Sequence, residues 1–156
     1  MPSATAELNV GDLAPAFEAA DETGGVHRLA DYKGKTVVLY FYPKDNTSGC
    51  TAEACDFRDS HKQYGKKGAV ILGVSPDDAK SHAGFKRKHK LPFPLLADTD
   101  KKLCSAYGVW KEKSMYGRKY MGVERSTFVI GPGGVIQAVH RKVKVPGHVE
   151  SVLESL

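Results

Sequence analysis

The feature that most constrains this chain is a run from Lys35 to Tyr42 that is rich in β-branched and aromatic side chains and that Pro43 ends. Such residues favour strands, whereas a proline inside a strand removes a ladder hydrogen bond. Because the run does not alternate between apolar and polar residues, it predicts a strand that is buried on both faces. We therefore expect a sheet with a packed layer on each side.

A second strand is predicted from Ala69 to Ser75, where Pro76 ends another apolar run. The polar segment from Thr51 to Tyr64 lies between the two strands and is long enough for a helix. A strand, a helix and a second strand in this order form a β-α-β unit, whose two strands run parallel.

The remaining pattern completes a single α/β domain over residues 1–156, with no repeat and no linker-like segment. Two apolar runs around the glycine-rich turn at 131–134 predict an antiparallel hairpin. The expected elements are helices over 77–90, 98–107 and 149–156, an apolar segment at 95–97, and hairpin strands at 126–130 and 135–140. They predict a mixed central sheet with helices on both faces, broadly thioredoxin-like in arrangement.

The composition is that of an ordinary folded domain, with 26% charged and 41% apolar residues. No apolar run approaches the roughly 20 residues that a membrane-spanning helix needs. Met1 to Asn9 has neither a basic start nor an apolar stretch, so a secretory signal is not expected. We expect a cytoplasmic protein that does not bind membranes.

The formal net charge is +5, and basic residues gather at Lys86–Lys90 and at His140–Lys142. A basic patch can attract nucleic acid. However, no aromatic residue interrupts the first cluster, so it offers no platform on which bases could stack. We interpret both clusters as solvated surfaces and expect no nucleic-acid partner.

The three cysteines, Cys50, Cys55 and Cys104, are too few and odd in number for a secreted disulfide framework. In a cytoplasmic chain, the close pair Cys50 and Cys55 indicates catalysis, redox chemistry or metal binding. Cys104 lies near Leu103 and Tyr107 on a predicted short helix, and we interpret it as a packing residue.

Cys50 lies where the loop from Tyr42 to Gly49 meets the predicted helix. Unpaired N–H groups and the positive end of the helix dipole favour an anion there, and the thiolate is the nucleophilic form of cysteine. Pro43 sets the direction of the chain after the strand, and the Thr47 hydroxyl can bind a small polar substrate. A packing role for Cys50 is less compatible with such polar flanking residues.

The segment Phe41–Thr51, which contains the pattern Pro43-x-x-x-Thr47-x-x-Cys50, resembles the active-site loop of the peroxiredoxins. With a second cysteine five residues on, it is similar to the peroxiredoxin Q (bacterioferritin comigratory protein) subfamily. Further similarity lies in Gly11–Phe17, Tyr107–Lys111 and Met115–Gly117.

This resemblance implies a peroxidase in which Cys50 is the peroxidatic cysteine and passes to a sulfenic acid. Thr47 would bind the substrate and the thiolate, and Pro43 would shield the thiolate. Arg125 matches the active-site arginine of the family and would hold the thiolate and the developing charge. Because Arg125 and Cys50 lie 75 residues apart, their proximity is implied by the resemblance alone.

Cys55 is the candidate resolving cysteine, which would form an intramolecular disulfide with Cys50. Helical residues five apart have Cα atoms about 8.7 Å apart, beyond the roughly 7 Å limit for a disulfide, so the helix would have to unwind in part. Some members of the subfamily carry the resolving cysteine in the next helix, but residues 77–90 contain no cysteine. A packing role for Cys55 on the helix face is the alternative.

The resemblance further implies a hydroperoxide substrate, thioredoxin or a similar dithiol as the reductant, no cofactor or metal, and a monomer. One competing function is a dithiol–disulfide oxidoreductase, although that chemistry usually employs Cys-x-x-Cys and this pair has four intervening residues. Another is a metal-binding or redox-sensing module that uses Cys50, Cys55 and His61. Their spacing does not match a closed structural zinc site.

Overall fold

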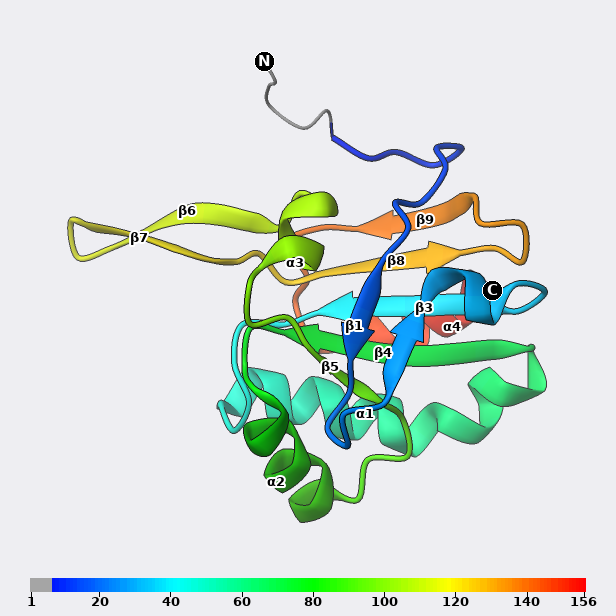
Figure 1. Cartoon of the computed structure of the whole chain (residues 1–156), viewed down its shortest axis with the longest axis horizontal. Coiled ribbons are helices and arrows are strands. Elements are labelled where there is room, and N and C mark those ends of the chain that lie inside the picture. Colours follow the sequence, from blue (N-terminus) through cyan, green and yellow to red (C-terminus); the bar gives the residue numbers. More distant parts are fainter. Residues whose placement is uncertain (1–6) are drawn as a thin grey trace.

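The computed structural model describes residues 7–156, and a five-stranded mixed sheet in the order β5-β4-β3-β8-β9 lies at its centre (Figure 1). β3 runs parallel to β4, and β4 parallel to β5, whereas β8 and β9 add antiparallel strands on the other side. The strands are β3 (Thr36–Phe41), β4 (Ala69–Ser75), β5 (Leu95–Ala97), β8 (Ser126–Ile130) and β9 (Ile136–His140). The predicted buried strand is confirmed as β3, the central strand.

One face of this sheet packs against α1 (Ser48–Lys66), α2 (Ala79–His89) and α4 (His148–Glu154). The aromatic ring of Phe57, on α1, stacks on Tyr40 of β3, with ring centroids 4.5 Å apart. Each helix contributes apolar side chains to this core cluster because its apolar stripe faces the sheet.

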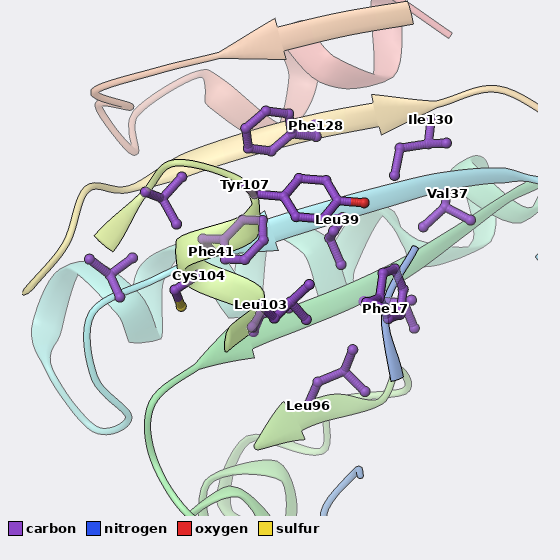
Figure 2. Packing of buried hydrophobic residues seen from close by; sticks show 14 of the residues in the cluster. Phe17, Val37, Leu39, Phe41, Leu96, Leu103, Cys104, Tyr107, Phe128 and Ile130 are labelled. Atoms are coloured by element: carbon purple, nitrogen blue, oxygen red, sulfur yellow. The ribbon is translucent and has the colours of Figure 1, made fainter. Parts of the chain in front are cut away.

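The opposite face is covered by α3 (Lys102–Ala106) and by the N-terminal segment around Phe17. Figure 2 shows side chains of the α3 region gathered against the aromatic residues of β3 and β8. Both faces therefore carry helices, and the predicted layered α/β architecture is confirmed.

Two hairpins and a short helical turn were missing from the sequence prediction. They are β1 (Glu18–Ala20) with β2 (Val26–Arg28), the 3₁₀ turn η1 (Leu29–Tyr32), and β6 (Trp110–Met115) with β7 (Arg118–Val123). The β6–β7 hairpin projects from the body of the molecule (Figure 1). Tyr116 and Gly117 join its strands with positive φ angles of 53° and 77°, as a type I′ turn requires.

Several helix boundaries also differ from the prediction. α1 begins at Ser48, so Cys50 lies inside its first turn instead of before it. α2 begins at Ala79 because the Asp78 side chain accepts a hydrogen bond from the backbone N–H of Ser81. α3 spans fewer residues than expected, and its first N–H groups bind the Asp98 carboxylate.

Two further expectations concern the chain as a whole. Among the residues that the structure describes, none of the helices is long and apolar enough to cross a membrane. Residues 1–6, which belong to the segment tested for a secretory signal, lie outside the described part of the chain.

Candidate active site around Cys50

Cys50 occupies the first turn of α1, and its side chain is 1% exposed. The first backbone bond of the helix runs from the N–H of Thr51 to the carbonyl of Thr47, at 2.8 Å. The N–H groups of Ser48, Gly49 and Cys50 therefore precede the helical ladder and have no partner within it. Together with the helix dipole, they favour a negative charge at the Cys50 sulfur.

The pairing of β3 with β8 brings Arg125 to this helix end. Phe41, the last residue of β3, lies opposite Ser126, the first residue of β8. Arg125 immediately precedes Ser126, so it lies at the same edge of the sheet as the loop that leads to Cys50. Its Nη2 donates a hydrogen bond to the Cys50 Sγ at 3.2 Å.

Gly49 makes room for this guanidinium. A Cβ atom at that position would lie 3.2 Å from Nη2 of Arg125, closer than most side-chain contacts allow. The sequence indicated only that Gly49 ends the loop before Cys50. The structure shows that the missing side chain also permits the close approach of the arginine to Cys50.

Glu53 is a member of the site that sequence reasoning missed. It lies one turn beyond Cys50 on α1, is fully buried, and accepts a hydrogen bond from Arg125 Nη1 at 2.6 Å. Burial, only partly offset by Arg125, raises the pKa of Glu53 to about 7. The available signal was a carboxylate three residues after Cys50, on the same side of the helix.

The second oxygen of Glu53 has no hydrogen-bond partner among the described residues. His148 Nε2 lies 4.0 Å from it and forms a 2.8 Å hydrogen bond with the Thr127 hydroxyl. Burial, together with the nearby His140 and Arg125, lowers the pKa of His148 to about 4. His148 is therefore neutral near pH 7, and Arg125 is the cation that faces Glu53.

The loop before Cys50 is anchored through Asp45, which is almost fully buried. Its carboxylate accepts hydrogen bonds from the Tyr42 hydroxyl, the Ser81 hydroxyl and His82 Nδ1 at 2.6 to 2.8 Å. Nε2 of His82 lies 2.9 Å from the carbonyl of Leu96. Burial disfavours the charged forms of Asp45 and His82. The hydrogen bonds that these two side chains make outweigh this effect, so the pKa of Asp45 is lowered and that of His82 is raised.

Pro43 and Thr47 lie in the same loop. Pro43 is half-buried directly after Tyr42, and Thr47 is exposed at the N-cap position of α1. The Thr47 hydroxyl donates a hydrogen bond to the Lys44 carbonyl at 2.9 Å. Its proton is therefore not directed to the Cys50 sulfur. A hydroxyl oxygen that donates once can still accept a hydrogen bond from a ligand.

The other two cysteines lie in different environments, and all three are free thiols. Cys55 is half-buried and lies within α1, as Cys50 does, so helical geometry keeps their Cα atoms about 8.7 Å apart. Cys104 is fully buried and packs beside Leu103 and Phe41 (Figure 2). Burial, with added repulsion from Asp98, raises the pKa of the Cys104 thiol.

The metal-binding alternative is not supported by the placement of its candidate ligands. Within the described part of the chain, Cys50, Cys55 and His61 do not form a cluster of ligand atoms; the group with such spacing is Asp45, Asp77 and His82. Their facing atoms already hydrogen-bond within the protein, as the Asp45 network shows.

Comparisons with known proteins identify the family of this chain. The model of the AhpC/TSA family matches residues 10–139. Peroxiredoxin Bcp of Bacillus subtilis is 52% identical over 149 residues, which cover 96% of this chain and 95% of that protein. The structure of the Xanthomonas campestris bacterioferritin comigratory protein has a TM-score of 0.86 and 45% identity, covering 89% of this chain and 88% of the other. PrxQ of Xylella fastidiosa, solved as a cysteine-to-serine mutant, has a TM-score of 0.91 and 42% identity, covering 96% of each chain.

The family match spans most of the domain, and the curated relative aligns along almost its whole length. The solved relatives share the arrangement of sheet and helices described above. The resemblance first seen in the loop around Cys50 is thus confirmed at the level of the whole chain. The chain belongs to the AhpC/TSA family, within its peroxiredoxin Q (bacterioferritin comigratory protein) subfamily.

Proposed function

We propose that Cys50 is the peroxidatic cysteine of this thiol-dependent peroxidase. The observation that carries the proposal is the 3.2 Å hydrogen bond from Arg125 to the Cys50 sulfur, at a helix end that itself favours an anion. A thiolate so placed is a ready nucleophile, and Arg125 can also stabilise the charge that develops on the substrate. The Xanthomonas campestris relative is described with alkyl peroxide reduction activity, which supports hydroperoxides as the substrate class here.

In the first step, the Cys50 thiolate attacks the terminal oxygen of the hydroperoxide. An S–O bond forms and the O–O bond breaks. The leaving oxygen takes up from solvent the equivalent of the proton that the Cys50 thiol released, and it departs as an alcohol or as water. Cys50 is left as a sulfenic acid. We assign to Thr47 the acceptance of the hydroperoxide O–H, because its own proton is already directed to Lys44. Pro43 would cover the sulfur from the side of the loop.

In the second step, Cys55 would resolve the sulfenic acid by forming a disulfide with Cys50 and releasing water. Both residues are helical in the reduced protein, and their separation is too large for a disulfide. The first turns of α1 must therefore unwind before the bond forms. Cys104 is a poor substitute, because it is buried on the opposite face of the sheet.

We further propose that thioredoxin or a similar dithiol returns the disulfide to the reduced state, and that the enzyme acts as a cytoplasmic monomer without a cofactor or nucleic-acid partner. A disulfide that holds a helix end open is strained, and strained disulfides are the readily reduced kind. A dithiol–disulfide oxidoreductase on this fold has less support, because the pair would lie too far apart in the folded helix.

The proposal is tested by following peroxide consumption with thioredoxin, its reductase and NADPH. Wild type and Cys104→Ser should turn over, whereas Cys50→Ser should consume peroxide no faster than the mixture without enzyme. Measuring bound metal on the same samples should give a substoichiometric value. Turnover by Cys50→Ser near the wild-type rate would contradict the assignment.

A further inference from the structure

Cys55 has a polar neighbour that comes from another helix. Nδ1 of His89, the last residue of α2, lies 3.9 Å from Cys55 Sγ, within the range of a hydrogen bond to sulfur. Both side chains are half-buried, so the contact lies at the edge of the packed core and not in open solvent.

The position of His89 is fixed by two further contacts. Its backbone carbonyl accepts a hydrogen bond from Arg58 Nη1 at 2.9 Å, which ties the end of α2 to α1. Its ring meets the fully buried ring of Phe85 edge-on, with centroids 5.2 Å apart. These two contacts hold His89 in place beside the Cys55 sulfur.

A guanidinium also lies near Cys55 on the same helix. Arg58 lies one turn beyond Cys55 on α1 and carries its charge nearby. The hydrogen bond with Asp59 raises the pKa of Arg58, whereas burial lowers it. A negative charge on Cys55 would raise the pKa of Arg58 further. Cys55 thus has a candidate proton acceptor in His89, and the Arg58 guanidinium is bound to the backbone carbonyl of that same residue.

We propose that His89 is the acid–base residue of the resolving step, an inference that rests on the proposed function of Cys50 and Cys55. Resolution requires a nucleophilic thiolate, and imidazole is the side chain best suited to accept its proton near neutral pH. His89 touches a reacting sulfur, so its role would be catalytic and not only positional.

The step balances without another reagent. His89 accepts the proton of the Cys55 thiol, and the Cys55 sulfur attacks the sulfenic sulfur of Cys50. The S–S bond forms and the S–O bond breaks. The leaving hydroxide takes the proton back from the His89 imidazolium, directly or through a water molecule, and departs as water. The oxidising equivalent is the one already held by the sulfenic acid.

The same contact indicates which end of the helix moves. Cys55 is tied to α2 through His89, and its neighbours Ala54 and Phe57 are fully buried. Cys50 precedes these anchors, at the helix end that borders the loop. The segment 48–53 should therefore unwind and carry the sulfenic acid to Cys55, while the helix beyond Ala54 stays in place.

The test is a single turnover of reduced His89→Ala with one equivalent of hydrogen peroxide, quenched at intervals and analysed by mass spectrometry. Loss of the thiol at Cys50 should keep its wild-type rate, whereas disulfide formation should slow by about a hundredfold, as loss of a general base predicts. Added imidazole should restore disulfide formation in proportion to its concentration. His61→Ala, a half-buried histidine on the same helix as Cys55, is the matched control and should resolve normally.

His89→Gln separates acid–base chemistry from packing, because glutamine can hydrogen-bond to sulfur but cannot accept its proton. It should remain folded and resolve as slowly as His89→Ala. Normal resolution in His89→Gln, or slow resolution in His89→Ala without rescue by imidazole, would overturn the proposal. If wild-type Cys50 does not react with peroxide at all, the proposed function fails instead, so the two failures are distinguishable.

Discussion

Arg125 and Cys50 are 75 residues apart in the sequence and 3.2 Å apart in the structure, where Nη2 of the arginine donates to the cysteine sulfur. The other arm of the same guanidinium binds Glu53 at 2.6 Å. One arginine is therefore shared between the Cys50 sulfur and the buried carboxyl group of Glu53. We therefore expect the reactivity of Cys50 to depend on the position of the Arg125 guanidinium.

Replacing Arg125 tests whether its charge serves the reaction. Arg125→Ala should slow the oxidation of Cys50 by peroxide by about a hundredfold, the size of effect seen when a preorganised donor is removed. Stopped-flow measurement of the first step gives this rate directly. Arg28→Ala, which removes an exposed arginine paired with Glu18, is the control and should react normally. An unchanged rate in Arg125→Ala would remove the arginine from the mechanism.

Gly49 offers a finer perturbation of the same contact. In Gly49→Ala the new methyl group would meet Nη2 of Arg125, so the guanidinium must shift by a few tenths of an ångström. Since small misplacements in an active site are costly, we expect Cys50 oxidation to slow by roughly tenfold. The thermal midpoint should change little, because alanine favours the helix more than glycine does. Wild-type reactivity in this variant would show that the close approach is not required.

Glu53 predicts a specific dependence of stability on pH. Its pKa rises from 4.5 to about 7 on folding, so between these values the folded protein retains a proton that the unfolded chain has released. The contribution of Glu53 to the free energy of unfolding should therefore fall as the pH rises from about 4.5 to 7. The loss should be about 1.4 kcal/mol for each unit by which folding raises the pKa of Glu53.

Urea unfolding of wild type and Glu53→Gln at several pH values isolates this contribution. Glutamine cannot ionise, so the variant should gain stability relative to wild type as the pH increases through that window. A stability difference that stays constant from pH 4.5 to 7 would show that Glu53 does not hold its proton in the folded state.

The structural cost of resolution predicts local unfolding in the oxidised protein. Once the Cys50–Cys55 disulfide has formed, amide hydrogens of residues 48–53 should exchange with solvent far faster than in the reduced protein. Amides of α1 beyond Phe57 should remain protected, because that part of the helix packs in the core. Oxidised Cys55→Ser, which cannot form the disulfide, is the control. Equal exchange across 48–53 in both redox states would contradict the unwinding.

The sequence was sufficient to predict the main sheet because its signals are local. The apolar run of β3, the proline after it and the polar segment that becomes α1 together predict a β-α-β unit. The two hairpins were missed for a different reason. β1 and β2 are only three residues each, and β6 and β7 show no regular alternation of apolar and polar residues, so hydrophobic periodicity does not reveal them. The turn at Tyr116 and Gly117 was the remaining local signal.

In the site, too, some residues could be predicted from local sequence signals and others could not. Cys50 and its loop could be recognised from the residues around them, whereas the place of Arg125 depends on the register of β3 with β8, which local patterns do not specify. The roles of Glu53 and Gly49 follow from the orientation of that guanidinium, so they could not be predicted before Arg125 was placed. The contact between His89 and Cys55 likewise depends on how two helices pack.

The most direct test of the account is to oxidise the reduced protein with one equivalent of hydrogen peroxide and to map its disulfides by mass spectrometry. The account predicts one intramolecular bond between Cys50 and Cys55, with Cys104 still a free thiol. Cys55→Ser should react once and then remain a sulfenic acid at Cys50, or oxidise further. A bond from Cys50 to Cys104, a bond between two chains, or an unreacted Cys50 would contradict it.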